Sequence, residues 1–354
     1  MSHSHFASSP VLSGLGWDES FEQNFAAHRA HGRVPARVIQ VHRQACDVIG
    51  ELGQARLKTP KGSALCTGDW VAVRWADEPE IVELVSRRTA ITRAAVGGSS
   101  ESQALAANVD TVVIAVSLAM ALRPARIERL LAVAWESGAR PVIALTKADL
   151  AENIAAIQAE VSALAPGVDV VATSANTGEG VDIFTALISG TTVLLGPSGA
   201  GKSSLGNALL GTNALETGAV RQQDGKGRHT TVRRELLVVP SGGVLIDTPG
   251  LRGIGLTGGA ESVEQVFADI ETYGANCHFR DCAHHNEPGC GVLEAIELGV
   301  MPRRRLDSYR KLLRESEWQA ARSDARLRAK GTERIRRITK DQRAMYKFRA
   351  RQEG

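Results

Sequence analysis

One glycine-rich segment has the residue types and spacing of a phosphate-binding loop. It follows an apolar stretch, precedes a helix-forming one, and fits the pattern G-x-x-x-x-G-K-S. Its glycines let backbone N–H groups turn toward phosphate oxygens, and the helix N-terminus adds favourable partial charge. Lys202 is expected to reach the β- and γ-phosphates, and Ser203 to bind Mg²⁺. The expected nucleotide contacts are Gly196, Pro197, Ser198, Gly199, Ala200, Gly201, Lys202, Ser203 and Ser204.

Two other segments favour guanine as the base. The first resembles the N/T-K-x-D guanine motif of GTPases and consists of Thr146, Lys147, Ala148 and Asp149. Asp149 can accept hydrogen bonds from the N1–H and the exocyclic amine of guanine, whereas adenine has no donors there. The second resembles the element that closes over the base, with a backbone N–H bonding guanine O6, and consists of Ser174, Ala175 and Asn176. The predicted ligands are therefore GTP and GDP, although four residues such as TKAD also occur as a plain surface turn.

Two polar segments suit the γ-phosphate and a magnesium ion. Residues 247–250 read DTPG and resemble the D-x-x-G element of GTPases. Asp247 is expected to hold Mg²⁺ through water, and the Gly250 N–H to contact the γ-phosphate. Residues 227–231 read GRHTT and fit a switch I loop whose threonine coordinates Mg²⁺ in the GTP state. Both threonines of this segment qualify, and we favour Thr231.

The order of these motifs is circularly permuted. The guanine motif precedes the phosphate loop here, whereas it follows that loop in Ras-like proteins. Strands can be cut and rejoined in this way without altering a site, provided that the old chain ends lie close together. The permutation also means that the chain leaves the GTPase domain directly after Asp247. Whatever follows is therefore tethered to the part that senses the γ-phosphate.

Leu251 stands where many GTPases carry the glutamine that orients the attacking water. Because leucine cannot orient water, we expect slow intrinsic hydrolysis and help from another group. His229 is our candidate, since a neutral imidazole can orient water or accept its proton. His229→Ala should then keep nucleotide affinity and lose most turnover. The alternative is that His229 only packs or contacts RNA.

A second group of residues has the chemistry of a structural zinc site. Three of the five cysteines and one histidine follow the pattern C-x4-C-x-H-x5-C, and they are Cys277, Cys282, His284 and Cys290. Three thiolates and an imidazole suit a closed tetrahedral Zn²⁺ site, which leaves no open position for catalysis. His285 is adjacent and could replace His284. The odd cysteine count argues against a disulfide framework and for a reducing compartment.

The elements that must position these residues fall into successive domains. Residues 1–32 are polar and predicted to be an irregular N-terminal extension, anchored by Trp17, Phe21 and Phe25. Residues 33–96 contain short alternating strands, at 36–42, at 48–57 as two strands, at 70–75 and at 81–85. Five such strands favour a small β-barrel of the OB-fold type.

Strands alternate with helices beyond a linker predicted at residues 97–102. The expected strands are residues 111–118, 141–145, 168–173, 192–195, 235–239 and 244–247. The expected helices are residues 126–136, 154–164, 183–187 and 202–210. Near-continuous Val, Ile and Leu strands with helical crossovers predict a parallel sheet covered on both faces. The predicted fold class is thus multidomain α/β, with a permuted P-loop GTPase domain over residues 97–256 and a zinc-binding, basic helical domain over residues 257–354.

Charge is unevenly distributed along the 354 residues. Residues 301–354 carry 18 Lys and Arg against 7 Asp and Glu, a net charge of +11, while the other 300 residues carry 24 against 32, a net charge of −8. A basic arm on an acidic body suggests a polyanion partner, although many charged tails are simply solvated. No apolar run reaches the roughly 18 residues of a membrane span, and no apolar signal core begins the chain. We therefore expect a cytoplasmic monomer with no membrane partner.

Taken together, these residues resemble the RsgA family, the ribosome small subunit-dependent GTPases. The resemblance rests on the barrel, the permuted motifs, the GRHTT segment and the CHFRDCAHHNEPGC patch at residues 277–290. It implies an N-terminal OB-fold, a central permuted GTPase and a C-terminal zinc domain. It also implies that the protein acts in late maturation of the 30S subunit, with hydrolysis stimulated by that particle and with rRNA as a contact.

Two other functions stay open on the residues alone. The first is a non-enzymatic RNA-binding assembly factor in which the nucleotide only sets the conformation. The second is an ATP-dependent kinase or pump subunit, against which Asp149 argues. Turnover with and without small subunits separates the first from a GTPase, and a comparison of guanine with adenine binding separates the second.

Overall fold

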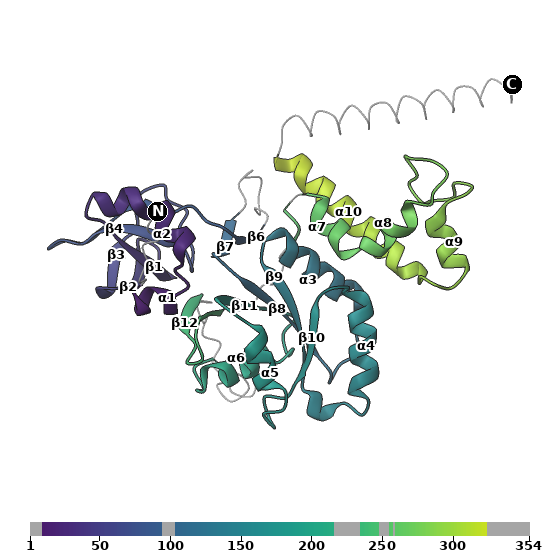
Figure 1. Cartoon of the computed structure of the whole chain (residues 1–354), viewed down its shortest axis with the longest axis horizontal. Helices are drawn as coiled ribbons and strands as arrows, with labels where there is room; N and C mark the ends of the chain where they lie inside the picture. Colours follow the sequence, from purple (N-terminus) through teal and green to yellow (C-terminus); the bar gives the residue numbers. More distant parts are fainter. Residues whose placement is uncertain (1–8, 94–102, 216–233, 248–254, 258, 324–354) are drawn as a thin grey trace, which may run out of the picture. The chain divides into compact units, whose positions relative to one another are not determined.

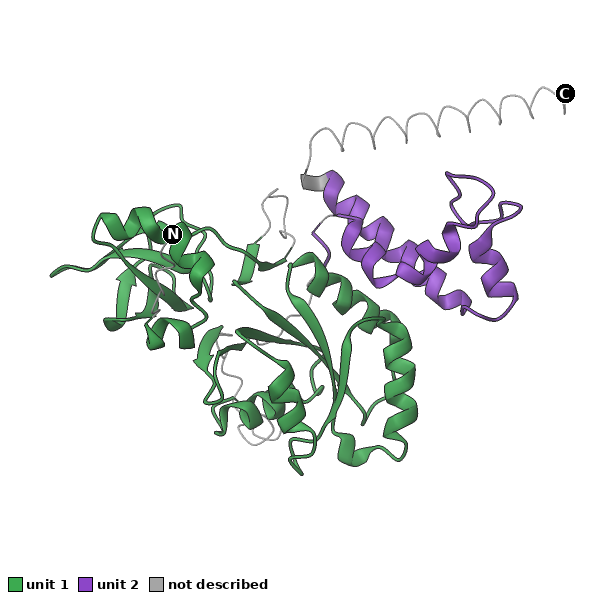
Figure 2. Cartoon of the chain, viewed as in Figure 1, with its two compact units in different colours: residues 1–93, 103–254 green, residues 94–102, 255–354 purple. Residues whose placement is uncertain are grey.

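The computed structural model describes residues 9–93, 103–215, 234–247, 255–257 and 259–323 (Figure 1). The described residues up to 247 form one compact unit, and those from 255 onward form another (Figure 2). The barrel and the central sheet therefore share a unit. The division into four domains at residues 32, 96 and 256 remains a prediction.

The first five strands form the predicted barrel. They are β1 (Val34–Val41), β2 (Ala45–Gly50), β3 (Gly53–Lys58), β4 (Trp70–Arg74) and β5 (Glu80–Leu84). All pair antiparallel in the order β3-β2-β1-β4-β5, and β3 also contacts β5, so the sheet curls back on itself. Val38, Val48 and Val71 are fully buried inside it. The expectation of an N-terminal OB-type barrel is confirmed.

The expectation that residues 1–32 are irregular is wrong for the described part. Helix α1 spans Pro10–Gly14 and α2 spans Glu19–Ala30, with Asp18 capping α2 through the Phe21 N–H at 3.0 Å. The predicted anchors, which recur every fourth residue from Trp17, are buried, and the Trp17 ring lies 4.6 Å from that of Trp70 in the barrel. An aromatic side chain at every fourth residue is typical of a helix, but the polar residues between the aromatics made the sequence pattern look irregular.

A short hairpin connects the barrel to the central sheet. Strand β6 (Ala90–Arg93) pairs antiparallel with β7 (Gln103–Ala107). The linker predicted at residues 97–102 lies outside the described residues.

The central sheet has six strands in the order β10-β9-β8-β11-β13-β12. They are β8 (Thr111–Ser117), β9 (Arg140–Thr146), β10 (Asp169–Thr173), β11 (Thr191–Leu195), β12 (Glu235–Val238) and β13 (Val244–Asp247). Five run parallel as predicted, but β12 is antiparallel to β13. The chain turns between β12 and β13 through Gly242 and Gly243, both at positive φ. This connection is too short for the crossover that two parallel strands need.

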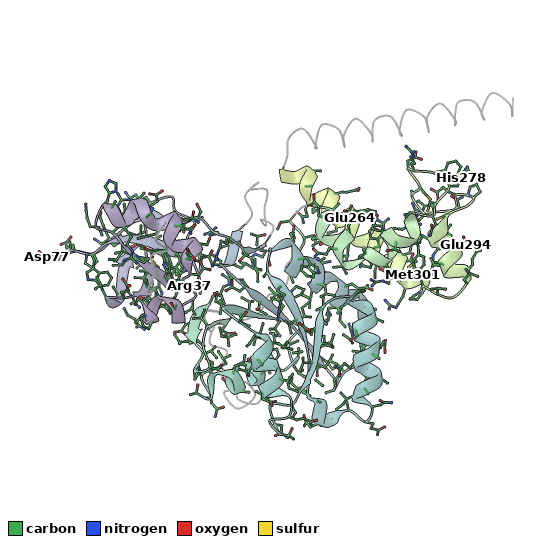
Figure 3. All side chains as sticks on the ribbon, in the orientation of Figure 1. Arg37, Asp77, Glu264, His278, Glu294 and Met301 are labelled. Atoms are coloured by element: carbon green, nitrogen blue, oxygen red, sulfur yellow. The ribbon has the colours of Figure 1, made fainter. Side chains whose placement is uncertain are left out.

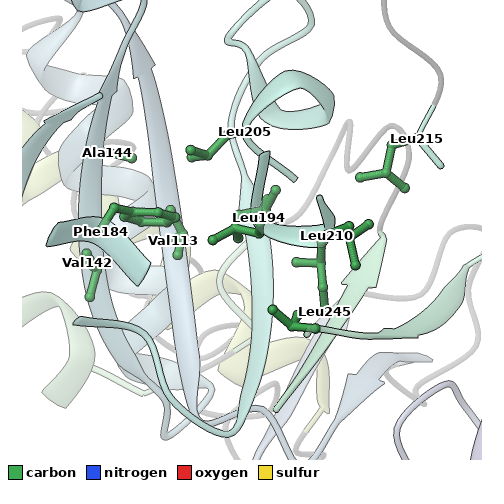
Figure 4. Close-up of a cluster of buried hydrophobic side chains, with 11 residues drawn as sticks. Val113, Val142, Ala144, Phe184, Leu194, Leu205, Leu210, Leu215 and Leu245 are labelled. Carbon is green, nitrogen blue, oxygen red and sulfur yellow. The ribbon is translucent and has the colours of Figure 1, made fainter. Parts of the chain in front are cut away.

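Helices cover this sheet on both faces (Figure 1). Helices α3 (Pro124–Glu136) and α4 (Ile154–Leu164) pack against β8, β9 and β10. Helices α5 (Val181–Leu187) and α6 (Lys202–Leu210) contact each other and contact β10 and β11, respectively. In Figure 4 the fully buried Phe184 ring of α5 lies beside Val113 and Val142 of the sheet. This core fixes the strand ends that carry the predicted nucleotide motifs.

The second unit is helical. Its elements are α7 (Glu261–Val266), α8 (Ala268–Gly274), α9 (Gly291–Glu297) and α10 (Arg303–Ser323). The buried Arg305 of α10 bonds both carboxylate oxygens of Asp269 at 2.5 and 2.8 Å and lies over the Phe267 ring at 4.7 Å. This paired cation ties α10 to α8. No helix in the described part of the chain combines the length and apolar character needed to cross a membrane.

Candidate nucleotide and metal sites

The predicted nucleotide motifs share one edge of the central sheet. Thr146, the last residue of β9, pairs in register with Ser117 at the end of β8 and Thr173 at the end of β10. The phosphate loop follows β11, which pairs with β8 on its other side. Chain order reverses between β8 and β11, and α/β sheets bind ligands at the carboxyl ends of strands at such a reversal.

The phosphate loop uses conformations that favour glycine. Gly199 and Gly201 have φ of +80° and +79°, and Gly201 caps α6. At Gly196, with φ of +150°, a Cβ would lie 2.7 Å from the Ala115 carbonyl oxygen of β8. A larger residue would therefore push the loop away from the sheet.

Lys202 lies across this loop. Its ammonium donates hydrogen bonds to the carbonyl oxygens of Gly196 at 3.0 Å and Pro197 at 2.8 Å. Ser203 is half-buried in the first turn of α6, while Ser198, Gly199 and Ser204 are exposed and Ala200 is buried. The backbone between Pro197 and Ala200 thus faces outward, beside a cation and a helix N-terminus, which together suit a polyphosphate.

The guanine motif contacts the phosphate loop directly. The Thr146 hydroxyl donates a hydrogen bond of 2.7 Å to the Ala200 carbonyl oxygen. A Cβ on Gly201 would lie 3.1 Å from the same hydroxyl, so a side chain at this position would crowd the guanine motif. Segments that occur in permuted order along the chain therefore meet in space, at the edge where one ligand can span both.

Asp149 is exposed at this edge and its carboxylate has a fixed orientation. Lys147 has φ of +59°, a left-handed conformation unusual for a residue with a side chain, and it precedes the short 3-10 helix η1 (Ala148–Leu150). The hydroxyl of the buried Ser174 donates to the Asp149 carboxylate at 2.6 Å. Ala175 and Asn176 are exposed beyond it. Sequence reasoning assigned this segment only a backbone contact to the base and missed the Ser174 side chain.

The predicted magnesium ligands are only partly described. Ser203 begins α6 after β11, and the half-buried Asp247 ends β13, the strand that pairs with β11. Both therefore belong to the same edge as the phosphate loop. Thr231, Gly250 and the candidate catalytic His229 lie outside the described residues.

The predicted metal ligands converge in the second unit. The ligand atoms of Cys277, Cys282, His284 and Cys290 all lie within 4.8 Å of one another. The His284 Nδ1 is 3.5 Å from the Cys277 sulfur and 3.4 Å from the Cys290 sulfur. Within the described chain, His284 rather than His285 joins this group. The Cys277 and Cys290 sulfurs are 3.8 Å apart, which matches the roughly 3.8 Å between two sulfurs bound tetrahedrally at about 2.3 Å to one Zn²⁺.

The surroundings favour the metal-binding forms of Cys277 and His284, whereas burial and the neighbouring cysteines raise the pKa of Cys282 to about 11 in the absence of metal. Burial alone would raise the pKa of Cys277, but the N–H groups of Val292 and Gly291 at the start of α9 favour its thiolate and lower the pKa. Burial lowers the pKa of His284, which favours the neutral imidazole that ligates metals. His284 itself has φ of +58°, and Arg310 of α10 donates to its carbonyl oxygen. The residues present therefore fit a structural zinc ion.

Comparison with known proteins gives concordant matches. A family model described as RsgA GTPase matches residues 84–257. A protein of Streptomyces coelicolor named small ribosomal subunit biogenesis GTPase RsgA is 52% identical over 339 residues, covering 93% of this chain and 92% of the relative. A protein of the same name from Methanosarcina acetivorans is 38% identical and covers 94% of this chain and 93% of the relative.

Two solved structures resemble the fold. The crystal structure of YjeQ from Thermotoga maritima has a TM-score of 0.61 and 26% identity, over 80% of this chain and 98% of that one. The structure of YloQ, described as a circularly permuted GTPase, has a TM-score of 0.59 and 23% identity, over 82% of this chain and 97% of that one. The second likeness supports the fold, including its permuted motif order.

Proposed function

This chain belongs to the RsgA family of GTPases, and on that premise we propose that it hydrolyses GTP on the small ribosomal subunit and assists the late maturation of that subunit. Family membership makes it a GTP-hydrolysing enzyme, which acts on an acid anhydride. The relatives named for small ribosomal subunit biogenesis match over more than nine-tenths of this chain, so the likeness is not limited to the nucleotide motifs.

The observation that supports binding of GTP by both motifs at once is the hydrogen bond between Thr146 and Ala200. Because it joins the guanine motif to the phosphate loop, one GTP molecule has its base at Asp149 and its phosphates at Lys202. Ser174 holds the Asp149 carboxylate in place for the two donors of guanine. The Lys202 ammonium exchanges its loop carbonyls for the β- and γ-phosphate oxygens.

Hydrolysis transfers the γ-phosphoryl group to water. The water oxygen forms a bond to the γ-phosphorus, the bond from that phosphorus to the β–γ bridging oxygen breaks, and GDP and inorganic phosphate leave. Ser203, Asp247 and Thr231 would hold Mg²⁺, which supplies charge neutralisation for the phosphates. We assign the orientation of the water to His229, because Leu251 cannot perform it.

The zinc site supports a structural role for the second unit. We propose one Zn²⁺ held by Cys277, Cys282, His284 and Cys290, with no open position. Metal analysis of the purified protein should give about one zinc per chain, and Cys290→Ala should lose it. Full zinc content in that variant would refute the assignment. Glu287→Gln, which alters a loop carboxylate that accepts backbone N–H groups but does not ligate, should keep the metal.

The basic arm supports rRNA as the contacted part of the subunit. Residues 301–354 have a net charge of +11, and phosphate contacts by such a segment make binding strongly salt-dependent. We further propose that the protein acts as a monomer in the cytoplasm. Sedimentation of the protein with and without small subunits, over a range of salt concentrations, tests the stoichiometry and the electrostatic contribution together.

The decisive experiment is GTP turnover by the purified chain with and without 30S particles. We expect slow turnover alone and at least about a tenfold acceleration by 30S particles, but none by 50S particles. ATP should not be hydrolysed, because adenine lacks the donors that Asp149 accepts. Equal rates with and without 30S particles would remove the ribosomal part of the proposal, and nucleotide binding without turnover would favour a non-enzymatic switch.

A further inference from the structure

One loop of the barrel contacts two strands of the central sheet that border the predicted nucleotide-sensing segments. We call this loop, Cys66–Asp69, the junction loop. The Thr67 hydroxyl donates to the Arg234 carbonyl oxygen at 3.3 Å, directly before β12. A Cβ on Gly68 would lie 2.9 Å from Cδ1 of Ile246, the β13 residue that precedes Asp247. The predicted switch I segment leads into β12, and the D-x-x-G segment begins where β13 ends.

The junction loop is held firmly in place. The Thr67 carbonyl accepts the Ala107 N–H at 3.0 Å, and the Gly68 carbonyl accepts from Asn108 Nδ2 at 3.0 Å. The fully buried Asp69 carboxylate takes two hydrogen bonds from Arg87, at 2.6 and 2.8 Å. Gly68 has φ of +92°, and a Cβ there would lie 2.3 Å from the Ala107 carbonyl oxygen. The loop therefore has little freedom to move independently of the chain around it.

Arg37 of β1 extends the same contact to β11. Its side chain is completely buried and donates to the Gly68 carbonyl at 3.2 Å, the Asn108 carbonyl at 3.2 Å and the Thr191 hydroxyl at 2.7 Å. Figure 3 shows Arg37 on the side of the barrel toward the central sheet. Burial lowers its pKa to about 10, so it remains charged at neutral pH. Thr191 begins β11, the strand that leads into the phosphate loop.

We propose that the junction loop transmits engagement of the barrel by small-subunit RNA to the strands that carry the switch segments, with Thr67 as a positioning residue for hydrolysis. The proposal rests on the proposed function for its RNA partner. The hydrogen bond to Arg234, next to β12, and the close approach of Gly68 to Ile246 of β13 mean that displacing the barrel shifts both paired strands at the Asp247 edge. Such a coupling acts in both directions, because linkage between two sites is reciprocal. GTP binding should therefore alter the junction loop as well.

The test uses full-length protein and two substitutions of Thr67. Thr67→Val keeps the shape but removes the hydrogen bond to Arg234, and Thr67→Ser restores the hydroxyl. The matched control is Thr89→Val, because the Thr89 hydroxyl donates to the Val109 carbonyl at 2.7 Å, before β8 and away from both switch strands. The measurement is the ratio of 30S-stimulated to basal GTP turnover, with 30S affinity measured in parallel.

Thr67→Val should lower that ratio roughly threefold to tenfold, the size expected for one hydrogen bond, and keep the affinity for 30S particles. Thr67→Ser should recover most of the loss, and Thr89→Val should keep the wild-type ratio. An unchanged ratio in Thr67→Val overturns the proposal. An equal loss in Thr89→Val also overturns it, since the effect would then be a general consequence of removing a hydroxyl hydrogen bond near the connection between the barrel and the central sheet.

A second measurement does not depend on the ribosome. Hydrogen–deuterium exchange of peptides covering the junction loop should differ between GDP and a non-hydrolysable GTP analogue in the wild type, and the difference should shrink in Thr67→Val. If 30S particles do not change wild-type GTP turnover but this exchange difference is present, the proposed function fails, while the coupling between nucleotide and junction loop stands. If exchange in the loop is independent of the nucleotide, the coupling fails whatever the particle does.

Discussion

The carboxyl edge of the central sheet and the barrel junction, meaning the contacts of Arg37 and the junction loop with that sheet, are built in opposite ways. At the edge, the phosphate loop leaves Ser198 and Gly199 exposed, and Lys202 bonds carbonyls only six and five residues earlier in the chain. At the junction, Arg37 is completely buried and bonds Thr191, 154 residues further along the chain. The edge therefore presents its polar groups to the outside, whereas the polar groups of the junction are hydrogen-bonded to one another in the interior.

This difference indicates which property each region supplies. Polar groups that face outward from a rigid frame can bind a ligand with little rearrangement. Polar groups that are buried and mutually bonded bind nothing, but removing one leaves its partners unsatisfied and costs stability. Substitutions at the edge should therefore change nucleotide binding and leave folding intact, whereas loss of the buried Arg37 side chain at the junction should lower stability and leave GDP affinity nearly unchanged. The following predictions test that separation.

The largest effect is expected at Lys202. Lys202→Ala should weaken GDP and GTP binding roughly a hundredfold to a thousandfold, because the cation that faces the phosphates is lost. The Gly196 and Pro197 carbonyls that it leaves are at a solvent-accessible loop, so the melting temperature should move by no more than about 2 °C. Titration with a fluorescent GDP analogue and thermal denaturation measure the two quantities. A tenfold or smaller loss of affinity would show that the loop binds phosphate without this side chain.

The opposite pattern is expected at Arg37. Arg37→Met should lower the free energy of unfolding by about 2–4 kcal/mol, because it removes the Arg37 donor from the Leu15 and Asn108 carbonyls and the Thr191 hydroxyl, and leaves the Gly68 carbonyl with only its bond from Asn108. Affinity for GDP should change less than about threefold, since none of these groups faces the nucleotide edge. Urea denaturation and GDP titration of the same preparation supply both values.

A matched arginine provides the control for this result. Arg88 stacks on Phe21 and pairs with Asp18, but its side chain is 34% exposed. Arg88→Met should therefore cost well under about 1 kcal/mol. If both variants lose similar stability, burial and bonding to the central sheet are not what distinguishes Arg37.

The two regions also differ in how far the sequence predicted them. The phosphate loop, the guanine motif and the cysteines were found because their chemistry depends on a few residue types at short, fixed spacings. The barrel and five parallel strands followed from alternating and continuous apolar patterns. Arg37, Thr67 and Asn108 carry no such pattern, because their partners are decided by tertiary packing. Strand β12 was predicted, but its antiparallel direction and helix α2 were missed for a related reason, since a short turn and an interrupted helical pattern are weak local signals.

Thr146 joins the two permuted segments and should have an intermediate effect. Thr146→Val removes its hydrogen bond to the Ala200 carbonyl and should weaken GDP binding roughly fivefold to tenfold, the contribution of one hydrogen bond. Thr173→Val is the control, because Thr173 ends the neighbouring strand β10 and its hydroxyl makes no hydrogen bond within the described chain. If both variants bind GDP equally well, contact between the guanine motif and the phosphate loop does not set the affinity.

The smallest effect is expected at an exposed ion pair elsewhere on the barrel. Comparing this pair with Arg37 tests whether charge or burial makes Arg37 important for stability. The Arg56 guanidinium bonds Asp47 at 2.6 and 2.9 Å. Against the opposing effect of burial, and with a further hydrogen bond from His42, it lowers the pKa of Asp47 to about 2. A carboxyl whose pKa is depressed in the folded state stabilises it above the unfolded pKa of roughly 4, and this stabilisation is lost as the pH falls toward 2.

Because the Arg56 side chain is 66% exposed, solvent screens most of this attraction. Asp47→Asn should lower the melting temperature by only about a degree at neutral pH, and the gap to the wild type should close as the pH falls from about 5 to about 2.5. Thermal denaturation of both proteins across this range measures it. If Asp47→Asn lost as much stability at neutral pH as Arg37→Met, exposed charge pairs would stabilise this chain as strongly as the buried junction does. The contrast between outward-facing polar groups and internally bonded ones would then no longer explain which substitutions affect folding.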